Sequence, residues 1–123
     1  MKQNPVRWFE LYVNDMERAQ KFYESVFENK LQKLPGTDLE IRAFPMEKDA
    51  PGASGALVKM EGLTPGSNSS LVYFGCDDCA VQAKRVLAAG GKIHKEKFSI
   101  GMYGHIALVY DTEGNMFGLH SMD

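Results

Sequence analysis

Residues 8–14 alternate between apolar and other side chains, with Phe9, Leu11 and Val13 on one face. An alternation of period two that is rich in aromatic and β-branched residues predicts a strand with one buried face. From residue 16 the apolar positions recur at helical spacing, directly after Asp15, which suits a helix N-cap. The pattern therefore predicts a strand over 8–14 and a helix over about 16–27.

Three further strands are predicted in the first half of the chain. Residues 30–34 and 39–44 are separated by a Pro-Gly turn, and residues 56–60 follow a polar loop. In the strand over 39–44, Leu39, Ile41 and Ala43 alternate with Glu40, Arg42 and Phe44. We expect the set that begins with Leu39 to pack against the helix.

The second half of the chain repeats the first. Residues 111–122 match residues 49–60 at a shift of 62, which places Gly118 opposite Ala56. A second capping residue, Asp78, lies 63 positions after the first. A repeat of this length predicts two similar modules.

Each half is thus expected to be β-α-β-β-β. Residues 62–70, rich in Gly and Ser, suit a linker between the halves. We predict an α+β fold in a single domain over 1–123, with module one over about 6–61 and module two over about 71–123. Because one helix covers only one face of each sheet, the opposite faces meet each other or line a cleft.

Composition narrows the classes of function. The formal net charge of -2 provides no basic field for nucleic acid, and no apolar run approaches the length that spans a membrane. The residues after Met1 do not resemble a signal peptide, and the two cysteines suit reduced thiols. We therefore expect a cytoplasmic protein that binds neither nucleic acid nor membranes.

Several short motifs, in this order and spacing, resemble one known family. They are ELYVND at residues 10–15 with the following Arg-Ala and Phe-Tyr pairs, FGCDD at 74–78, and DTEGN at 111–115. Over essentially its whole length the chain resembles the vicinal oxygen chelate superfamily, which includes glyoxalases, extradiol dioxygenases and bleomycin-resistance proteins. The resemblance implies two βαβββ modules that form a cup-shaped mixed sheet around a divalent metal.

The family's metal ligands are His, Glu or Gln at four strand positions. The resemblance places these positions at Trp8, Ala56, Leu71 and Gly118, none of which has a donor side chain. A divalent transition metal needs three or four N, O or S ligands. We therefore expect neither a metal nor another cofactor.

Strand alternation predicts which side chains face the cup. This lining is mostly apolar with a few polar groups, as in small-molecule pockets; it consists of Trp8, Glu10, Tyr12, Ala56, Val58, Leu71, Tyr73, Gly118 and His120. Small residues at 56 and 118 would leave room where ligands stand in the family. Two interpretations stay open, because Trp8 either borders a pocket or fills this room as core.

His120 and Glu10 are the candidate catalytic residues, since a carboxylate can orient an imidazole for acid-base work. A histidine that only forms a structural hydrogen bond near the strand end is the alternative, and we favour it. His94 and His105 could join His120 in a displaced metal site, although their positions do not match the family pattern.

Three other features each have a functional and a structural interpretation. Arg42 could reach the cup rim and bind an anionic ligand, although a solvated face fits its position equally well. The loop over 99–104, which contains Tyr103 between two glycines, could cover the pocket as a lid or simply connect two strands. Cys76 and Cys79 have CxxC spacing, but buried apolar cysteines explain them better.

We predict a glyoxalase/bleomycin-resistance-like protein that binds a small, partly apolar molecule in the cup without a metal. The alternative is an enzyme, either a metal-dependent lyase or isomerase with displaced ligands or a metal-free acid-base catalyst. The sequence leaves open whether the protein is an enzyme. Because an isolated cup would expose apolar surface, and single-domain members of the family typically dimerise, we expect a homodimer.

Overall fold

The computed structural model describes residues 4–63, 65–66, 69–112 and 114–123. It divides the chain into two compact units. The units divide after Arg7 and after Ser70, inside two strands. We count the whole strand Val6–Tyr12 with module one, which otherwise ends before Ser70, and the whole strand Ser70–Gly75 with module two. Part of the predicted linker over 62–70 lies outside the described residues.

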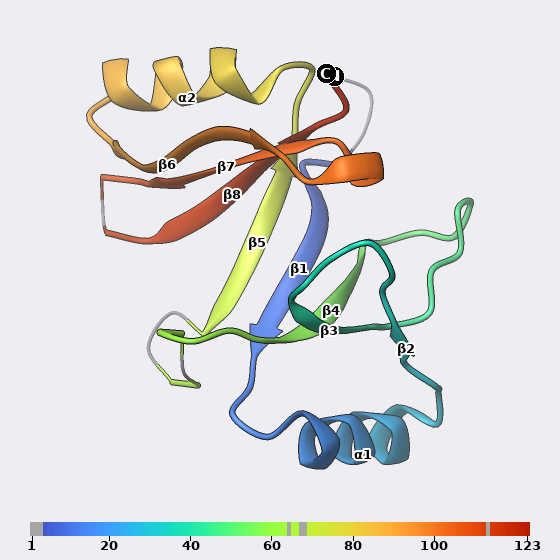
Figure 1. The fold of residues 1–123 in the computed structure, drawn as a ribbon. Coiled ribbons are helices and arrows are strands. Elements are labelled where there is room, and N and C mark those ends of the chain that lie inside the picture. The colour runs from blue at the N-terminus through green and yellow to red at the C-terminus, as the bar shows by residue number, and fades with distance from the viewer. Residues whose placement is uncertain (1–3, 64, 67–68, 113) are drawn as a thin grey trace. The chain divides into compact units, whose positions relative to one another are not determined.

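Module one contains one helix and a four-stranded mixed sheet (Figure 1). Its elements are β1 (Val6–Tyr12), α1 (Met16–Phe27), β2 (Gln32–Lys33), β3 (Glu40–Ala43) and β4 (Ser54–Lys59). The strand order is β2-β3-β4-β1, with β4 parallel to β1 and antiparallel to β3. Helix α1 begins where predicted because the Asp15 carboxylate accepts a hydrogen bond from the backbone N–H of Arg18 at 3.0 Å.

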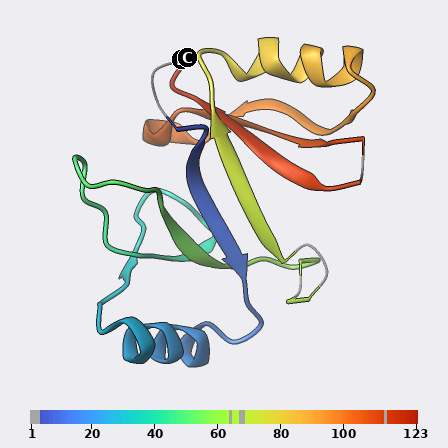
Figure 2. The same ribbon diagram turned by 180° about the vertical axis from the view of Figure 1, so that it is seen from behind.

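Module two has the same connectivity (Figures 1 and 2). Its elements are β5 (Ser70–Gly75), α2 (Cys79–Ala88), β6 (Lys92–Ser99), the short 3-10 helix η1 (Gly101–Tyr103), β7 (His105–Tyr110) and β8 (Met116–Ser121). The strand order is β5-β8-β7-β6, with β5 parallel to β8. The Asp78 carboxylate caps α2 by accepting from Ala80 N–H at 2.9 Å.

The predicted α+β fold of two βαβββ modules is confirmed. Strand β4 (Ser54–Lys59) and strand β8 (Met116–Ser121) are offset by 62 residues at both ends, which is the shift found in the sequence. The first strand covers Val6–Tyr12 rather than 8–14, because the chain at Asn14 and Asp15 turns to cap α1. In the described part of the chain, no helix has the length and apolar character needed to span a membrane.

A helix covers one face of each sheet. In module one, Met16 of α1 packs with Leu31 and with Leu57 of β4. In module two, Cys79 and Ala83 of α2 pack against Ala107, Val109 and Leu119. Figure 1 shows α1 beside the strands of module one and α2 beside those of module two.

The face predicted for β3 was wrong. Arg42 pairs with Leu57, which lies on the helix-covered face, whereas Ile41 pairs with Val58 on the other face. Phe44, directly after β3, contacts Tyr23 of α1 with ring centroids 5.7 Å apart. Arg42 and Phe44, which alternate with Ile41 and Ala43, therefore lie on the side of the helix. Leu39, which was expected to pack against the helix, is 39% exposed.

Candidate functional site

The helix-free face of module one brings together the residues expected there. Glu10 lies opposite Ala56 and Tyr12 opposite Val58 in the parallel pairing of β1 with β4. Ala43 of β3 lies opposite Ala56 on the same face. Trp8 and Glu10 are half-buried, while the other residues of this group are buried. We call Trp8, Glu10, Tyr12, Ala43, Ala56 and Val58 the Glu10 face.

The Glu10 carboxylate is held by its two neighbours on this face. The hydroxyl of Tyr12 donates to Oε1 at 2.9 Å, and Nε1 of Trp8 donates to Oε2 at 3.3 Å. All three side chains come from one strand at spacing two, so their common orientation follows from strand geometry. Trp8 thus orients the carboxylate in addition to providing apolar surface.

Tyr12 acts only as a donor in this arrangement. Burial, the charge of Glu10 and the hydrogen bond to Glu10 raise the pKa of Tyr12 far above its ordinary value of 10.0. The phenol therefore keeps its proton throughout the physiological pH range. It can hold the Glu10 carboxylate in place, but it cannot serve as a base.

Arg42 is not on the Glu10 face. It lies on the helix-covered face, where Nη2 is 3.6 Å from Oε1 of Glu17 on α1. The expectation that Arg42 reaches the cup rim is therefore corrected. Since Glu17 is exposed, this ion pair adds little stability.

Module two places Leu71, Tyr73, Gly118 and His120 on one face of its sheet, as expected. Tyr73 lies opposite Gly118 in the parallel pairing of β5 with β8. The expected room at Gly118 is absent, because a Cβ at this position would overlap the ring of Tyr73. The ring packs directly on the glycine backbone, and Tyr73 is only 5% exposed.

His120 has a strong structural hydrogen bond. Its Nε2 lies 2.6 Å from the backbone oxygen of Tyr103 in η1, and this nitrogen must carry a proton to donate to a carbonyl. The segment over 99–104, for which the sequence suggested a lid or a plain connection, contains η1. The hydrogen bond between His120 and Tyr103 attaches this segment to β8. The structural hydrogen bond favoured for His120 is present, and the pairing of His120 with Glu10 stays a prediction.

The residues at the family's ligand positions do not fit a metal. Trp, Ala, Leu and Gly have no suitable donor atoms, and the ring of Tyr73 occupies the space beside Gly118. His105 and His120 cannot form the displaced site together, because their register with Ser121 and Ile106 places them on opposite faces of β7 and β8. Among the described residues no group of three or more His, Cys, Asp or Glu could hold a metal ion.

The two cysteines belong to the core of module two. Cys79 is fully buried, and Cys76 packs against the same cluster on the helix side of β5. Burial is the main cause that raises the pKa of the Cys76 thiol, and the charges of Cys79 and Asp78 add to it. Asp78 itself pairs with Lys97 at 2.9 Å. A reactive thiolate is not favoured here.

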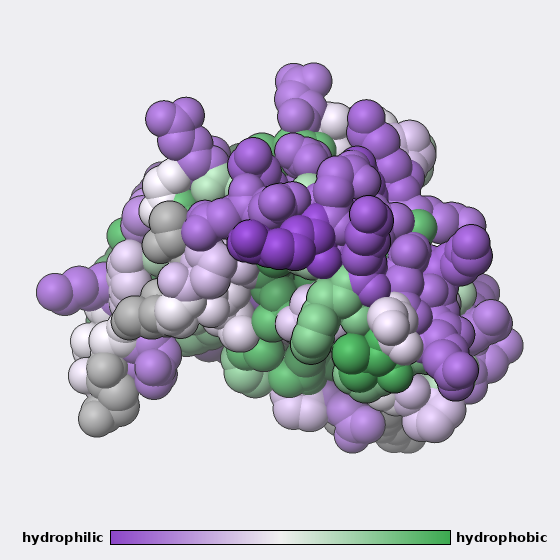
Figure 3. Space-filling view, turned by 90° about the horizontal axis from the view of Figure 1, so that it is seen from below, coloured by the Kyte–Doolittle hydropathy of each residue, from purple (hydrophilic) through white to green (hydrophobic). Residues whose placement is uncertain are grey.

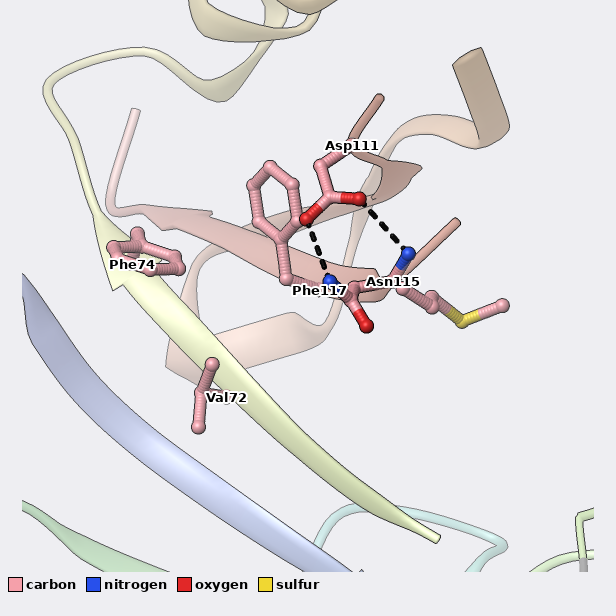
Figure 4. Close-up of a pocket in the computed structure, with 6 residues that line it drawn as sticks. Val72, Phe74, Asp111, Asn115 and Phe117 are labelled. Atoms are coloured by element: carbon pink, nitrogen blue, oxygen red, sulfur yellow. Dashed lines mark hydrogen bonds between the residues drawn. The ribbon is translucent and has the colours of Figure 1, made fainter. Parts of the chain in front are cut away.

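Two surface pockets lie on the helix sides of the sheets, one in each module. The sequence did not indicate either of them. A pocket of about 400 Å³ in module two is lined by Val72, Phe74, Asp111, Asn115, Met116 and Phe117 (Figure 4). Asp111 accepts hydrogen bonds from the backbone and side-chain nitrogens of Asn115, so its carboxylate closes the turn between β7 and β8. The repeated Asp-Gly turn is thus structural.

The second pocket, of about 530 Å³, lies in module one. Strand β1, helix α1 and the loop before β4 form its walls, and it is lined by Phe9, Leu11, Tyr23, Phe27, Asn29, Phe44, Pro45, Glu47 and residues 50–54. We call it the aromatic pocket. The sequence analysis placed Phe9 on the core face of its strand, but it placed Phe44 on the face away from the helix, so it did not bring these aromatic residues together.

Solved structures with the same fold show low sequence identity to this chain. A hypothetical protein from Bacillus halodurans C-125 is 14% identical, with a TM-score of 0.72 over 99% of this chain and 96% of that chain. A methylmalonyl-CoA epimerase from Streptomyces coelicolor in complex with 2-nitronate-propionyl-CoA is 12% identical, with a TM-score of 0.66 over 96% of each chain.

A third structure is a glyoxalase/bleomycin resistance protein/dioxygenase superfamily member from Vibrio splendidus 12B01. It is 19% identical, with a TM-score of 0.67 over 94% of this chain and 98% of that chain. Among curated protein sequences no match was found. The family model of the Glyoxalase/Bleomycin resistance protein/Dioxygenase superfamily matches residues 6–119. The chain therefore belongs to this superfamily.

Proposed function

We propose that the protein binds a small, partly apolar molecule on the Glu10 face without a metal. The observation that carries the proposal is the Glu10 carboxylate held by Trp8 and Tyr12 on the face of the module-one sheet opposite α1. Pockets for small molecules combine apolar walls with a few oriented polar groups. Here the half-buried Trp8 provides the apolar surface over a buried base of Ala43, Ala56 and Val58, and the carboxylate is the oriented group.

The chemistry of this face defines the ligand class. A carboxylate accepts hydrogen bonds and attracts cations, and the hydrogen bond from the Tyr12 phenol fixes its orientation while other lone pairs of its oxygens can accept from a ligand. We propose a ligand with a hydrogen-bond donor, such as an amine or a hydroxyl group, attached to an apolar body. We propose binding without a metal because the residues at the family's ligand positions have no donor atoms for one. These residues are Trp8, Ala56, Leu71 and Gly118.

A thermal-shift experiment tests this proposal. Chelator-treated protein is screened against benzylamine, benzyl alcohol and related amines and alcohols, and we expect at least one to raise Tm. Replacing Glu10→Gln should weaken binding of that compound by about tenfold or more, because hydrogen bonds to charged groups contribute about 1.5–3 kcal/mol. The matched control is Glu61→Gln, which changes an exposed carboxylate outside the Glu10 face and should leave affinity unchanged.

Two results would contradict the proposal. One is the absence of any Tm shift across the screen, and the other is equal affinity of the Glu10→Gln variant and the unaltered protein. The enzymatic alternative with displaced metal ligands is separated by elemental analysis of protein purified without chelator. Stoichiometric Ni, Zn, Fe or Mn would overturn the metal-free proposal.

We also propose that the protein is a homodimer. Three methionines are largely exposed, with Met46 at 56%, Met102 at 74% and Met122 at 60%. Methionine is enriched at protein interfaces relative to other surfaces. We expect light scattering of the purified protein to give twice the 13.7 kDa of the chain. A monomer mass at high protein concentration would contradict the proposal.

A further inference from the structure

The aromatic pocket of module one lies apart from the Glu10 face. Phe9 alternates with Trp8 and Glu10 along β1, so it projects to the opposite side of the sheet. The pocket therefore lies on the helix-covered side, between β1, α1 and the loop before β4. Its volume of about 530 Å³ falls within the range of roughly 300–1,000 Å³ that is usual for small-molecule sites.

The aromatic walls of this pocket are fixed by their own packing. The rings of Phe9 and Tyr23 each lie 5.7 Å from that of Phe44, measured between centroids. Phe9 also rests directly on Gly55, where a Cβ would overlap its ring. Tyr23 and Phe27 are stacked, with a distance of 6.3 Å and an interplanar angle of 10°. Such preformed walls reduce the entropy that a ligand loses on binding.

The loop that closes the pocket is also held at both ends. The hydroxyl of Ser54 donates to the backbone oxygen of Pro45 at 3.0 Å, and Phe44 N–H donates to Gly55 O at 2.9 Å. Within the loop, Ala50 N–H donates to Glu47 O at 3.2 Å. The first two bonds join the ends of the loop beside Phe44, and the third bond lies within the loop.

Two features of this pocket favour the binding of a ligand. Phe27 is 62% exposed although it stacks on a pocket wall, so a large apolar ring faces water. Asn29 lines the pocket, and its Oδ1 is buried without a hydrogen-bond partner among the described residues. A buried acceptor without a partner is costly, and a ligand donor near this amide would remove the cost. Figure 3 shows the face that carries α1, where hydrophobic side chains gather among hydrophilic ones.

We propose that the aromatic pocket binds a flat aromatic molecule that carries an N–H donor. The stacked rings provide the apolar walls, Phe27 covers the bound ring, and the Asn29 amide turns its oxygen toward the donor. Glu47 is the charged residue in the lining, which disfavours an anionic ligand and favours a neutral or cationic one. This site goes beyond the proposed function, because it uses none of the residues of the Glu10 face.

Calorimetric titration with indole and 1-methylindole tests the proposal. Both molecules are flat and aromatic, but only indole has the N–H donor. We expect indole to bind more tightly than 1-methylindole. We expect Phe27→Ala to weaken indole binding by about fivefold to tenfold, as for the loss of one aromatic contact. Asn29→Leu should make the two compounds bind equally, because the acceptor is removed.

The chain offers a matched control for Phe27. Phe22 lies in the same helix and is exposed to a similar extent, at 58%, but it does not line the pocket. Phe22 contacts Tyr23 with ring centroids 5.1 Å apart but does not itself line the pocket, so Phe22→Ala should weaken indole binding much less than Phe27→Ala does. Glu10→Gln should leave indole affinity unchanged, so failure of this proposal and failure of the proposed function are distinguishable. Phe27→Leu replaces Phe27→Ala if the alanine variant does not fold.

Three outcomes would overturn the proposal. They are no binding of indole at millimolar concentration, equal loss of affinity in the Phe22→Ala and Phe27→Ala variants, and equal binding of the two compounds to unaltered protein. Amide chemical shifts in an NMR titration supply the location. Changes at Phe27, Asn29 and Phe44 support the pocket, whereas changes confined to Trp8 and Tyr12 contradict it.

Discussion

Replacing Gly118→Ala is expected to destabilise the protein by about 1–3 kcal/mol, the usual cost of overpacking a filled site. The new Cβ would overlap the ring of Tyr73, which is buried and lies directly on the glycine. The overlap includes Cγ of Tyr73, at the base of the ring, so a small shift of the far end of the side chain does not relieve it. Urea denaturation measures the change in the free energy of unfolding.

A double-mutant cycle identifies the cause of this effect. Tyr73→Ala removes the ring and leaves a cavity, which is destabilising by itself. If ring overlap is the cause, Gly118→Ala should cost much less when Tyr73→Ala is already present. A Gly118→Ala variant that is as stable as the unaltered protein would show that the space beside Gly118 is open.

The same contact predicts that Gly118→Glu, which places a family ligand at this position, gives an unstable protein and no metal site.

Replacing Leu57→Ala is expected to cost about 2–5 kcal/mol, as is typical for large-to-small changes in a core. Leu57 is fully buried, and it packs with Met16 of α1 and with Leu31. The change leaves a cavity between the helix and the sheet of module one. Thermal and urea denaturation should both detect it.

Leu39→Ala is the matched control for this substitution. Leu39 was expected from the sequence to pack against α1, but the structure leaves it 39% exposed, directly before β3. Its replacement should cost about 1 kcal/mol or less, which is usual away from the core. Equal losses in the two variants would contradict the assignment of faces in module one.

The elements predicted best are those with local signals of their own. Asp15 and Asp78 each accept a hydrogen bond from the first turn of a helix, so both helices begin where the sequence placed them. The repeat at a shift of 62 located β4 and β8, because both follow a turn that contains Asp and Gly. Alternation correctly placed Glu10, Tyr12, Ala56 and Val58 on one face.

The errors concern packing that local patterns do not contain. In the strand predicted over 39–44 both sets of alternating residues include apolar members, Ile41 in one and Phe44 in the other, so hydrophobicity could not identify the inner face. The position of Arg42 was wrong for this reason. The room at Gly118 was wrong for another reason, since it depends on the cross-strand neighbour Tyr73 rather than on the glycine. The aromatic pocket needs contacts among β1, α1 and the loop before β4, which are distant in sequence.

Aromatic rings rest on glycine in both modules, but one position apart. In module one Phe9 rests on Gly55, directly before Ala56, whereas in module two Tyr73 rests on Gly118, the repeat counterpart of Ala56. If the halves arose by duplication, the two copies did not lose the ancestral ligand in the same way. In module one the ligand position holds Ala56, and the ring of Phe9 lies on the opposite face of the sheet. In module two the ligand position holds Gly118, and the ring of Tyr73 fills the space beside it. The two positions have therefore diverged: Ala56 carries a methyl group on the face that holds the Glu10 carboxylate, whereas at Gly118 an aromatic ring fills the space beside the backbone.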